Sequence, residues 1–220
     1  PIRTKMVNHL GGYTQVDSQL DFMGKTLATE TRHKRTNGST ELVTLEEFTY
    51  SAQDRLLTHT HQINGGAKQL LAKNTYDELG QLIAKNVGGT DVTGTTSLQK
   101  VDYKYNIRGW LKDINDVMNL GTDLFAFKIS YNDPATTSKA LFNGNISETY
   151  WKTSGDLNRR KYEYQYDHLN RLLNAVYKLP DSNIDQKESY QEIIAYDKNG
   201  NITNLKRWGA KVSTSVPQMD

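Results

Sequence analysis

Polar and apolar residues alternate along many short stretches of this chain, and the alternation has the two-residue period of a β-strand. Tyrosine occupies every second position at Tyr162, Tyr164 and Tyr166, and Tyr103 and Tyr105 repeat the pattern earlier in the chain. Successive side chains of a strand point to opposite faces of a sheet, so the members of each set share one face. The pattern predicts half-buried strands that are separated by short turns.

A seven-residue motif ends several of these stretches. An aromatic residue is followed by an acid or amide, by a turn-forming residue four positions after the aromatic, and by an aliphatic residue six positions after it. The residues that define the motif are Tyr76, Asp77, Gly80, Leu82, Tyr105, Asn106, Gly109, Leu111, Gly144, Ile146, Tyr166, Asp167, Asn170, Leu172, Tyr196, Asp197, Gly200 and Ile202. Weaker copies begin at Leu20, Tyr50 and Ala140, and in the first of these the aliphatic residue comes one position late.

The seven copies recur with a period of about 29 residues, which is the range of structural repeats. They begin at positions 20, 50, 76, 105, 140, 166 and 196, which places one insertion before Ala140. The fourth position after each start holds Gly, Asn or Asp, the residues that most readily adopt a positive φ. We therefore expect β-hairpin turns at these points, with Gly80, Gly109, Gly144 and Gly200 mostly at positive φ.

The predicted fold is all-β: an antiparallel, coiled sheet of serial hairpins with about two strands in each repeat. No boundary interrupts the period, so the sequence predicts a single repeat array over residues 1–220. A competing interpretation places a short helix over residues 78–85, because Leu79, Leu82 and Ile83 keep helical spacing. The glycine in the middle of that stretch and its Thr, Tyr and Val flanks favour the hairpin.

The motif Tyr-Asp-x-x-Gly-x-Leu, recurring at this interval, resembles the tyrosine-aspartate (YD) repeat of bacterial Rhs proteins. The resemblance extends from about Leu20 to Arg207. It implies a spiralling β-sheet like that of the C components of insecticidal toxin complexes and of the teneurins, where such sheets close as a hollow shell. In the bacterial proteins the shell commonly houses a toxic polypeptide.

The resemblance implies a structural function: an internal segment of a repeat shell that encloses a toxin polypeptide in a bacterial secreted or cell-surface system. The partners that it implies are further repeats of a longer chain or a neighbouring copy, joined through sheet edges. Shells of this family use many more than seven repeats and carry autoproteolytic carboxylates in a segment after them. Asp133-Pro134 is followed by Ala135 and Thr136 and not by the glycine of the family's motif, so no protease role is assigned to it.

Composition limits the other function classes. The chain has 27 basic and 25 acidic residues, a net charge of +2, 13 tyrosines and no cysteine. The near-neutral charge gives a weak long-range field, which disfavours nucleic acid as a partner despite short basic runs at Arg32–Arg35 and Arg159–Lys161. No apolar run exceeds four residues, far fewer than the roughly twenty of a membrane-spanning helix.

Several short patterns imitate catalytic or ligand-binding motifs. Gly24-Lys25-Thr26 ends like a phosphate-binding loop but lacks the glycine five residues earlier, and Asp197–Asn201 resembles a calcium loop with its glycine misplaced. His59 and His61 share one strand face and supply at most half of a zinc site, with His33 as the other histidine nearby. We therefore expect no enzymatic activity, no cofactor and no metal site.

The competing function is that of a cell-surface module that binds glycans. The tyrosines, Trp110, Trp151, Trp208 and the basic runs offer the aromatic and charged groups that an adhesion surface needs. A structural interpretation of the same aromatic residues is that they stack between successive hairpins, where each buries a large area.

Overall fold

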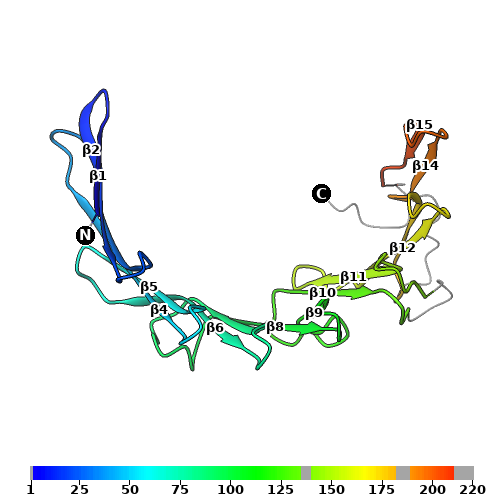
Figure 1. Cartoon of the computed structure of the whole chain (residues 1–220), viewed down its shortest axis with the longest axis horizontal. Coiled ribbons are helices and arrows are strands. Elements are labelled where there is room, and N and C mark those ends of the chain that lie inside the picture. The colour runs from blue at the N-terminus through cyan, green and yellow to red at the C-terminus, as the bar shows by residue number, and fades with distance from the viewer. Residues whose placement is uncertain (1, 135–139, 182–188, 211–220) are drawn as a thin grey trace. The chain divides into compact units, whose positions relative to one another are not determined.

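The computed structural model describes residues 2–134, 140–181 and 189–210, and every regular element in this part of the chain is a β-strand (Figure 1). The strands are β1 (Ile2–Val7), β2 (Gly11–Leu20), β3 (Thr26–Thr36), β4 (Leu42–Tyr50), β5 (Leu56–Ile63), β6 (Gln69–Tyr76), β7 (Leu82–Val87), β8 (Gln99–Tyr105), β9 (Leu111–Ile114), β10 (Phe125–Ser130), β11 (Glu148–Thr153), β12 (Arg160–Tyr166), β13 (Leu172–Lys178), β14 (Glu192–Tyr196) and β15 (Ile202–Arg207). The all-β prediction is confirmed. None of the described residues forms a helix that is long and apolar enough to span a membrane.

The strands follow one another in a single hydrogen-bonded order from β1 to β15, and every pair of neighbours is antiparallel. The topology is therefore a series of hairpins, as the repeat predicts. Within the described residues, β1 pairs only with β2, and β15 pairs only with β14. These two strands are the edges of the sheet.

The chain divides into two compact units, Pro1–Asp102 and Tyr103–Asp220, which we describe separately. The first unit holds β1 to β7 and the beginning of β8, and the second holds the end of β8 and the strands after it. The hairpin order continues through both units. That all 220 residues form one repeat array stays a prediction.

The motif marks strand ends with high regularity. Six of its seven predicted starts are the last residue of a strand, namely Leu20, Tyr50, Tyr76, Tyr105, Tyr166 and Tyr196. In all six the next strand begins six residues later, and the register shifts by one residue immediately before the strand end. The first copy also obeys this spacing because β3 begins at Thr26, so the apparent delay in its sequence is absent from its backbone.

The fifth copy differs from the prediction. Ala140 ends no strand and is exposed; β10 ends at Ser130, and Tyr131 directly after it is 8% exposed. Tyr131 follows Tyr105 by 26 residues, a normal repeat interval. The insertion therefore lies inside the fifth turn, between Tyr131 and Ile146, and not before the aromatic residue.

The helical alternative for residues 78–85 is wrong. Glu78 and Leu79 lie in a turn, and Leu82 begins strand β7. Ile83 is 37% exposed while Ala84 is buried, which is the alternation of a strand.

Among the residues that the structure describes, few side chains are buried. In the second unit, Val117, Leu120, Ala126 and Tyr150 form a cluster in which the β9–β10 connection contributes two members. In the first unit, Leu70 is 1% exposed. Because so little apolar area is enclosed, contacts between neighbouring repeats must contribute much of the stability, as in other repeat proteins.

Candidate functional site

The turns of the repeat have one hydrogen-bond pattern. In the last repeat the Asp197 N–H donates to the Asn201 carbonyl at 2.9 Å, and the Gly200 N–H donates to the Asp197 carbonyl at 3.2 Å. The carboxylate of Asp197 accepts the N–H groups of Asn199 and Asn201. The same two backbone bonds recur in the turns that follow Leu20, Tyr50, Tyr76, Tyr105 and Tyr166.

The side chain that follows the strand end holds each turn. Asp21, Ser51, Asn106 and Asp167 each accept two backbone N–H groups, two and four residues onward. This explains why the motif tolerates aspartate, asparagine and serine there, since all three present an oxygen at short reach.

Hydrogen bonds to these carboxylates lower their pKa values. The backbone N–H of Lys25 holds the pKa of Asp21 below its ordinary value, and the backbone N–H of Arg171 does the same for Asp167. At Asp197 the largest contribution comes from the Asn201 side chain. The charged form of each aspartate is therefore the form that stabilises its turn.

Three of the four predicted glycine turns are confirmed. Gly80, Gly109 and Gly200 have φ values of 83°, 78° and 90° in hairpin turns. Gly144 has φ of 95°, but it lies in a bend of the long β10–β11 connection and not in a tight hairpin. Asn170 takes the same left-handed conformation with φ of 63°, which asparagine tolerates better than most residues.

Tyrosine hydroxyls join five of the repeats to the repeat before them. The Tyr76 hydroxyl donates to the carbonyl of Leu56 at 3.0 Å, and the Tyr196 hydroxyl donates to that of Leu172 at 3.0 Å. The same bond joins Tyr50 to Thr26, Tyr131 to Leu111 and Tyr166 to Ile146. In four of these pairs the acceptor lies six residues after the motif start of the preceding repeat. The exception is Tyr166, whose acceptor, Ile146, follows the insertion of the fifth repeat. The tyrosine of the motif is therefore a link between repeats as well as an apolar side chain.

In four copies of the motif, the residue five positions after the start packs over the aromatic residue of the next repeat. Lys25 lies 4.9 Å from the centre of the Tyr50 ring, and Arg171 lies 4.6 Å from that of Tyr196. Arg55 takes this place over Tyr76 at 5.9 Å. In the fourth repeat the residue is Trp110, whose ring centre lies 5.2 Å from that of Tyr131. We call this fifth-position side chain the lid of the next repeat.

The lid also explains a glycine of the next turn. A β-carbon at Gly80 would overlap the Arg55 guanidinium, and one at Gly144 would press on the Trp110 ring. Arg171 continues the pattern by donating to the Asp197 carbonyl at 3.1 Å. The lid contact at Tyr131 supports its assignment as the fifth aromatic of the repeat.

Aromatic side chains also stack across the strands of the second unit. The ring of Trp151 on β11 lies 5.7 Å from that of Tyr162 on β12, and Tyr162 lies 5.5 Å from Tyr177 on β13. Tyr162 and Tyr164 are stacked at 6.0 Å, so these two members of the predicted tyrosine face lie on one side of β12, while the register shifts just before Tyr166. Burial raises the pKa of Tyr162, Tyr164 and Tyr177.

A buried ionic network joins β11, β12 and β13 at the strand positions that alternate with the stacked tyrosines. Lys161, 1% exposed, lies 2.7 Å from a carboxylate oxygen of Glu148, which is fully buried, and 2.7 Å from Glu163. Lys178 adds a second cation to Glu163 at 2.7 Å. Burial opposes the charge on Lys161, but the hydrogen bonds to Glu148 and Glu163 outweigh it and raise the lysine pKa.

The residues that resembled ligand-binding motifs in the sequence make structural contacts in this fold. Lys25 is the lid over Tyr50 and pairs with Asp21 and Asp54. His59 is stacked on Phe48 with ring centres 4.5 Å apart, and His33 contacts the Thr14 hydroxyl. Among the described residues, no group of three or more His, Asp or Glu side chains is arranged to hold a metal ion.

Carboxylates pair with Arg32 in the first basic run and with all three cations of the second. Arg32 contacts Glu30 at 2.6 Å and Glu41 at 3.3 Å. In the second run, Arg160 is held by Asp156, and Lys161 belongs to the buried network. Arg32 and the three cations of the second run therefore have local electrostatic partners.

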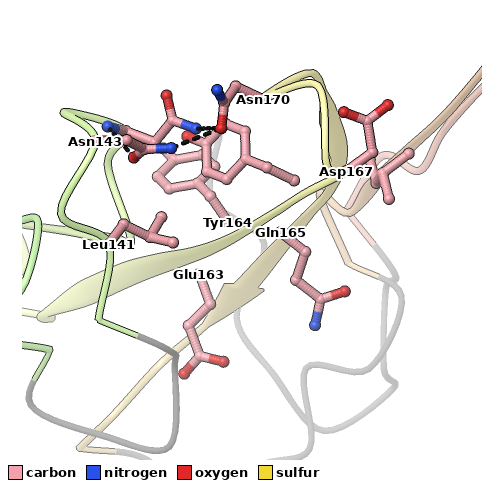
Figure 2. Close-up of a pocket in the computed structure, with 10 residues that line it drawn as sticks. Leu141, Asn143, Glu163, Tyr164, Gln165, Asp167 and Asn170 are labelled. Atoms are coloured by element: carbon pink, nitrogen blue, oxygen red, sulfur yellow. Dashed lines mark hydrogen bonds between the residues drawn. The ribbon is translucent and has the colours of Figure 1, made fainter.

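The second unit contains a pocket of about 530 Å³ between the fifth and sixth turns (Figure 2). Its walls carry side-chain amides, carboxylates, tyrosine rings and leucines. The residues that line it are Leu141, Asn143, Asn145, Glu163, Tyr164, Gln165, Tyr166, Asp167, Asn170 and Leu173. A smaller pocket of about 390 Å³ lies next to it, and the two share Leu141 as a lining residue.

Comparisons with known proteins relate the chain to a toxin complex by fold. No family model matches the sequence, and no curated protein matches it. A similar solved structure is the pore form of the Photorhabdus luminescens Tc holotoxin that carries a mutation in TccC3, with a TM-score of 0.54 and 15% identity. The alignment covers 88% of this chain and 9% of that chain. The similarity supports a fold like that of the YD-repeat shell.

Proposed function

We propose that this chain is a section of wall in a YD-repeat shell that encloses a polypeptide cargo in a bacterial secreted or cell-surface toxin system. The observation that carries the proposal is the repeated link between hairpins: a tyrosine hydroxyl bonded to the preceding repeat and, at several repeats, a lid packed over the next aromatic ring. Each link needs only the adjacent repeat, so the same sheet can be extended by any number of repeats. The fold similarity to the Tc holotoxin pore supports the same assignment.

The edges of the sheet support a role within a larger assembly. Every residue of β1 and of β15 is exposed, and unpaired strand edges bind other strands through their backbone groups. The edge partners that we propose are further repeats of a longer chain or a neighbouring copy. The motif residues retain the structural role proposed for them, with no catalytic role assigned.

Protease protection tests this function. The complete protein that contains these repeats is digested under native conditions, and its fragments are identified by mass spectrometry. Enclosure predicts that the repeats protect a separate polypeptide segment, which becomes sensitive when the shell is opened by mild denaturant. If every segment outside the repeats is digested at the rate measured after denaturation, the protein does not enclose a cargo.

A further inference from the structure

The sequence contains four asparagines that are followed directly by glycine, namely Asn37, Asn64, Asn143 and Asn199. Such a pair is chemically labile, because the glycine has no β-carbon to hinder attack by its backbone nitrogen on the carbonyl carbon of the asparagine side chain. The attack requires that the asparagine side chain can rotate toward the glycine and that the glycine N–H is not held by an acceptor. The contacts of each pair therefore determine how fast it reacts in the folded protein.

Hydrogen bonds hold three of the four pairs. The side-chain oxygen of Asn64 accepts the Val43 N–H at 2.8 Å. The side-chain amide of Asn143 donates to the side-chain oxygen of Asn170 at 2.6 Å. In the pair that begins at Asn199, the Gly200 N–H donates to the backbone carbonyl three residues earlier at 3.2 Å. Each of these bonds must break before the glycine nitrogen can attack.

The pair formed by Asn37 and Gly38 has neither restraint. Both residues are exposed, and they lie in the turn between β3 and β4. Within the described part of the chain, neither the Asn37 side chain nor the Gly38 N–H makes a hydrogen bond. A β-carbon added to Gly38 would meet no atom within 4 Å, so the space around this pair is open.

The hydrogen bonds of this turn lie on either side of the pair and not on it. The Ser39 N–H donates to the Thr36 carbonyl at 3.2 Å, and the Thr36 N–H donates to the Ser39 hydroxyl at 3.1 Å. These bonds keep the ends of β3 and β4 together while the two middle residues can rotate. The reactive geometry is therefore accessible without unfolding of the sheet.

We propose that Asn37 is a site of spontaneous deamidation in the folded protein. The Gly38 nitrogen bonds to Asn37 Cγ and gives up its proton, and the bond from Cγ to Nδ2 breaks as ammonia leaves with that proton. Water then opens the cyclic imide at either of its carbonyls, which produces aspartate or isoaspartate at this position. The reaction adds a negative charge next to the basic run Arg32–Arg35. This modification goes beyond the shell function and does not depend on it.

Ageing of the 220-residue chain in mildly alkaline buffer tests the proposal. Peptide mapping by mass spectrometry follows the mass difference between acid and amide at each of the four asparagines, and electron-transfer dissociation identifies isoaspartate. In the folded chain we expect Asn37 to react about tenfold faster than each of the others, because each of those must first lose a hydrogen bond. In concentrated urea the four rates should converge, because glycine follows every one of these asparagines. Equal rates in the folded chain, or the same ranking in urea, would overturn the proposal.

A pair of variants checks the attacking atom. Gly38→Ala places a methyl group beside the nitrogen without a clash, and we expect it to slow the reaction at Asn37 by about tenfold. Gly209→Ala is the matched control, because that glycine also has open space and no positive φ but does not follow an asparagine. Circular dichroism confirms that both variants are folded. An unchanged rate at Asn37 in Gly38→Ala, or an equal slowing in Gly209→Ala, would contradict the assigned reaction.

Discussion

The hydroxyl of Tyr131 donates to the backbone carbonyl of Leu111, 3.1 Å away and twenty residues earlier in the chain. The bond joins the end of β10 to the beginning of β9, and Trp110 packs over the same tyrosine ring. Tyr131 therefore makes both contacts that define the aromatic position of a repeat. The long segment that follows it is an insertion that leaves these contacts intact.

Removal of this hydroxyl should weaken the second unit. Tyr131→Phe keeps the ring and its contact with Trp110 but leaves the Leu111 carbonyl without this donor. We expect the free energy of unfolding to fall by about 1 kcal/mol, as for a typical partly buried hydrogen bond. Urea denaturation measures the free energy of unfolding. Tyr103→Phe is the control, because Tyr103 is not one of the tyrosines whose hydroxyl bonds to the preceding repeat. Equal losses in both variants would show that the link has no special role.

Gly200 has a left-handed backbone conformation. We expect a residue with a β-carbon at this position to destabilise the protein through backbone strain and not through a steric clash. The φ of Gly200 is 90°, and the nearest atom that an added β-carbon would meet is 3.9 Å away, so there is no clash. We expect Gly200→Ala to destabilise the protein by about 1–2 kcal/mol, the cost of a left-handed alanine.

Gly38→Ala provides the comparison, because that glycine has open space around it and no positive φ. Thermal denaturation should rank Gly38→Ala near the parent protein and Gly200→Ala below it. The reverse order would refute the assigned turn conformation.

The turn aspartates should make stability depend on pH in the acid range. Hydrogen bonds lower the pKa values of Asp167 and Asp197 in the folded protein, so the stabilisation is present above their unfolded values and is lost as pH falls through the folded values. Asn106 makes the same turn bonds without a charge. We expect Asp167→Asn with Asp197→Asn to reduce the fall in melting temperature between about pH 5 and pH 2. If the melting temperature of the double variant falls with pH as steeply as that of the parent protein, these carboxylates are not the source of the pH dependence.

The buried network should be sensitive to loss of its central cation. Lys161→Met leaves Glu148 buried without its cation, and we expect a loss of about 3–5 kcal/mol in unfolding free energy. The double variant with Glu148→Leu removes both charges and should recover much of this loss. Chemical denaturation of the single and double variants measures the coupling. A double variant no more stable than Lys161→Met would contradict the pairing.

The strand ends could be predicted from the sequence because the residues of the motif form the turn through local interactions. Aspartate at the turn and a glycine four residues after the aromatic act locally, and their spacing places each hairpin without information from elsewhere in the chain. The fifth repeat was misplaced because its turn residues, around Gly144, are separated from their aromatic by an insertion. The interval of 26 residues from Tyr105 to Tyr131 was the signal that could have found it.

Contacts between repeats could not be predicted from the motif. The lids vary from Lys25 to Trp110, and their shared role appears only when successive turns lie beside one another. The pairing of Lys161 with Glu148 depends on strand register, which places Tyr150 and not Glu148 directly opposite the lysine. The pocket likewise depends on side chains from the fifth and sixth turns, which the motif alone does not bring together.

Electron cryomicroscopy of the complete protein that contains this chain tests the shell assignment most directly. The account predicts a closed wall in which these strands continue into further repeats at β1, β15 or both, with density for a polypeptide inside. A map in which the two edge strands remain unpaired and both faces of the sheet open to solvent would contradict it.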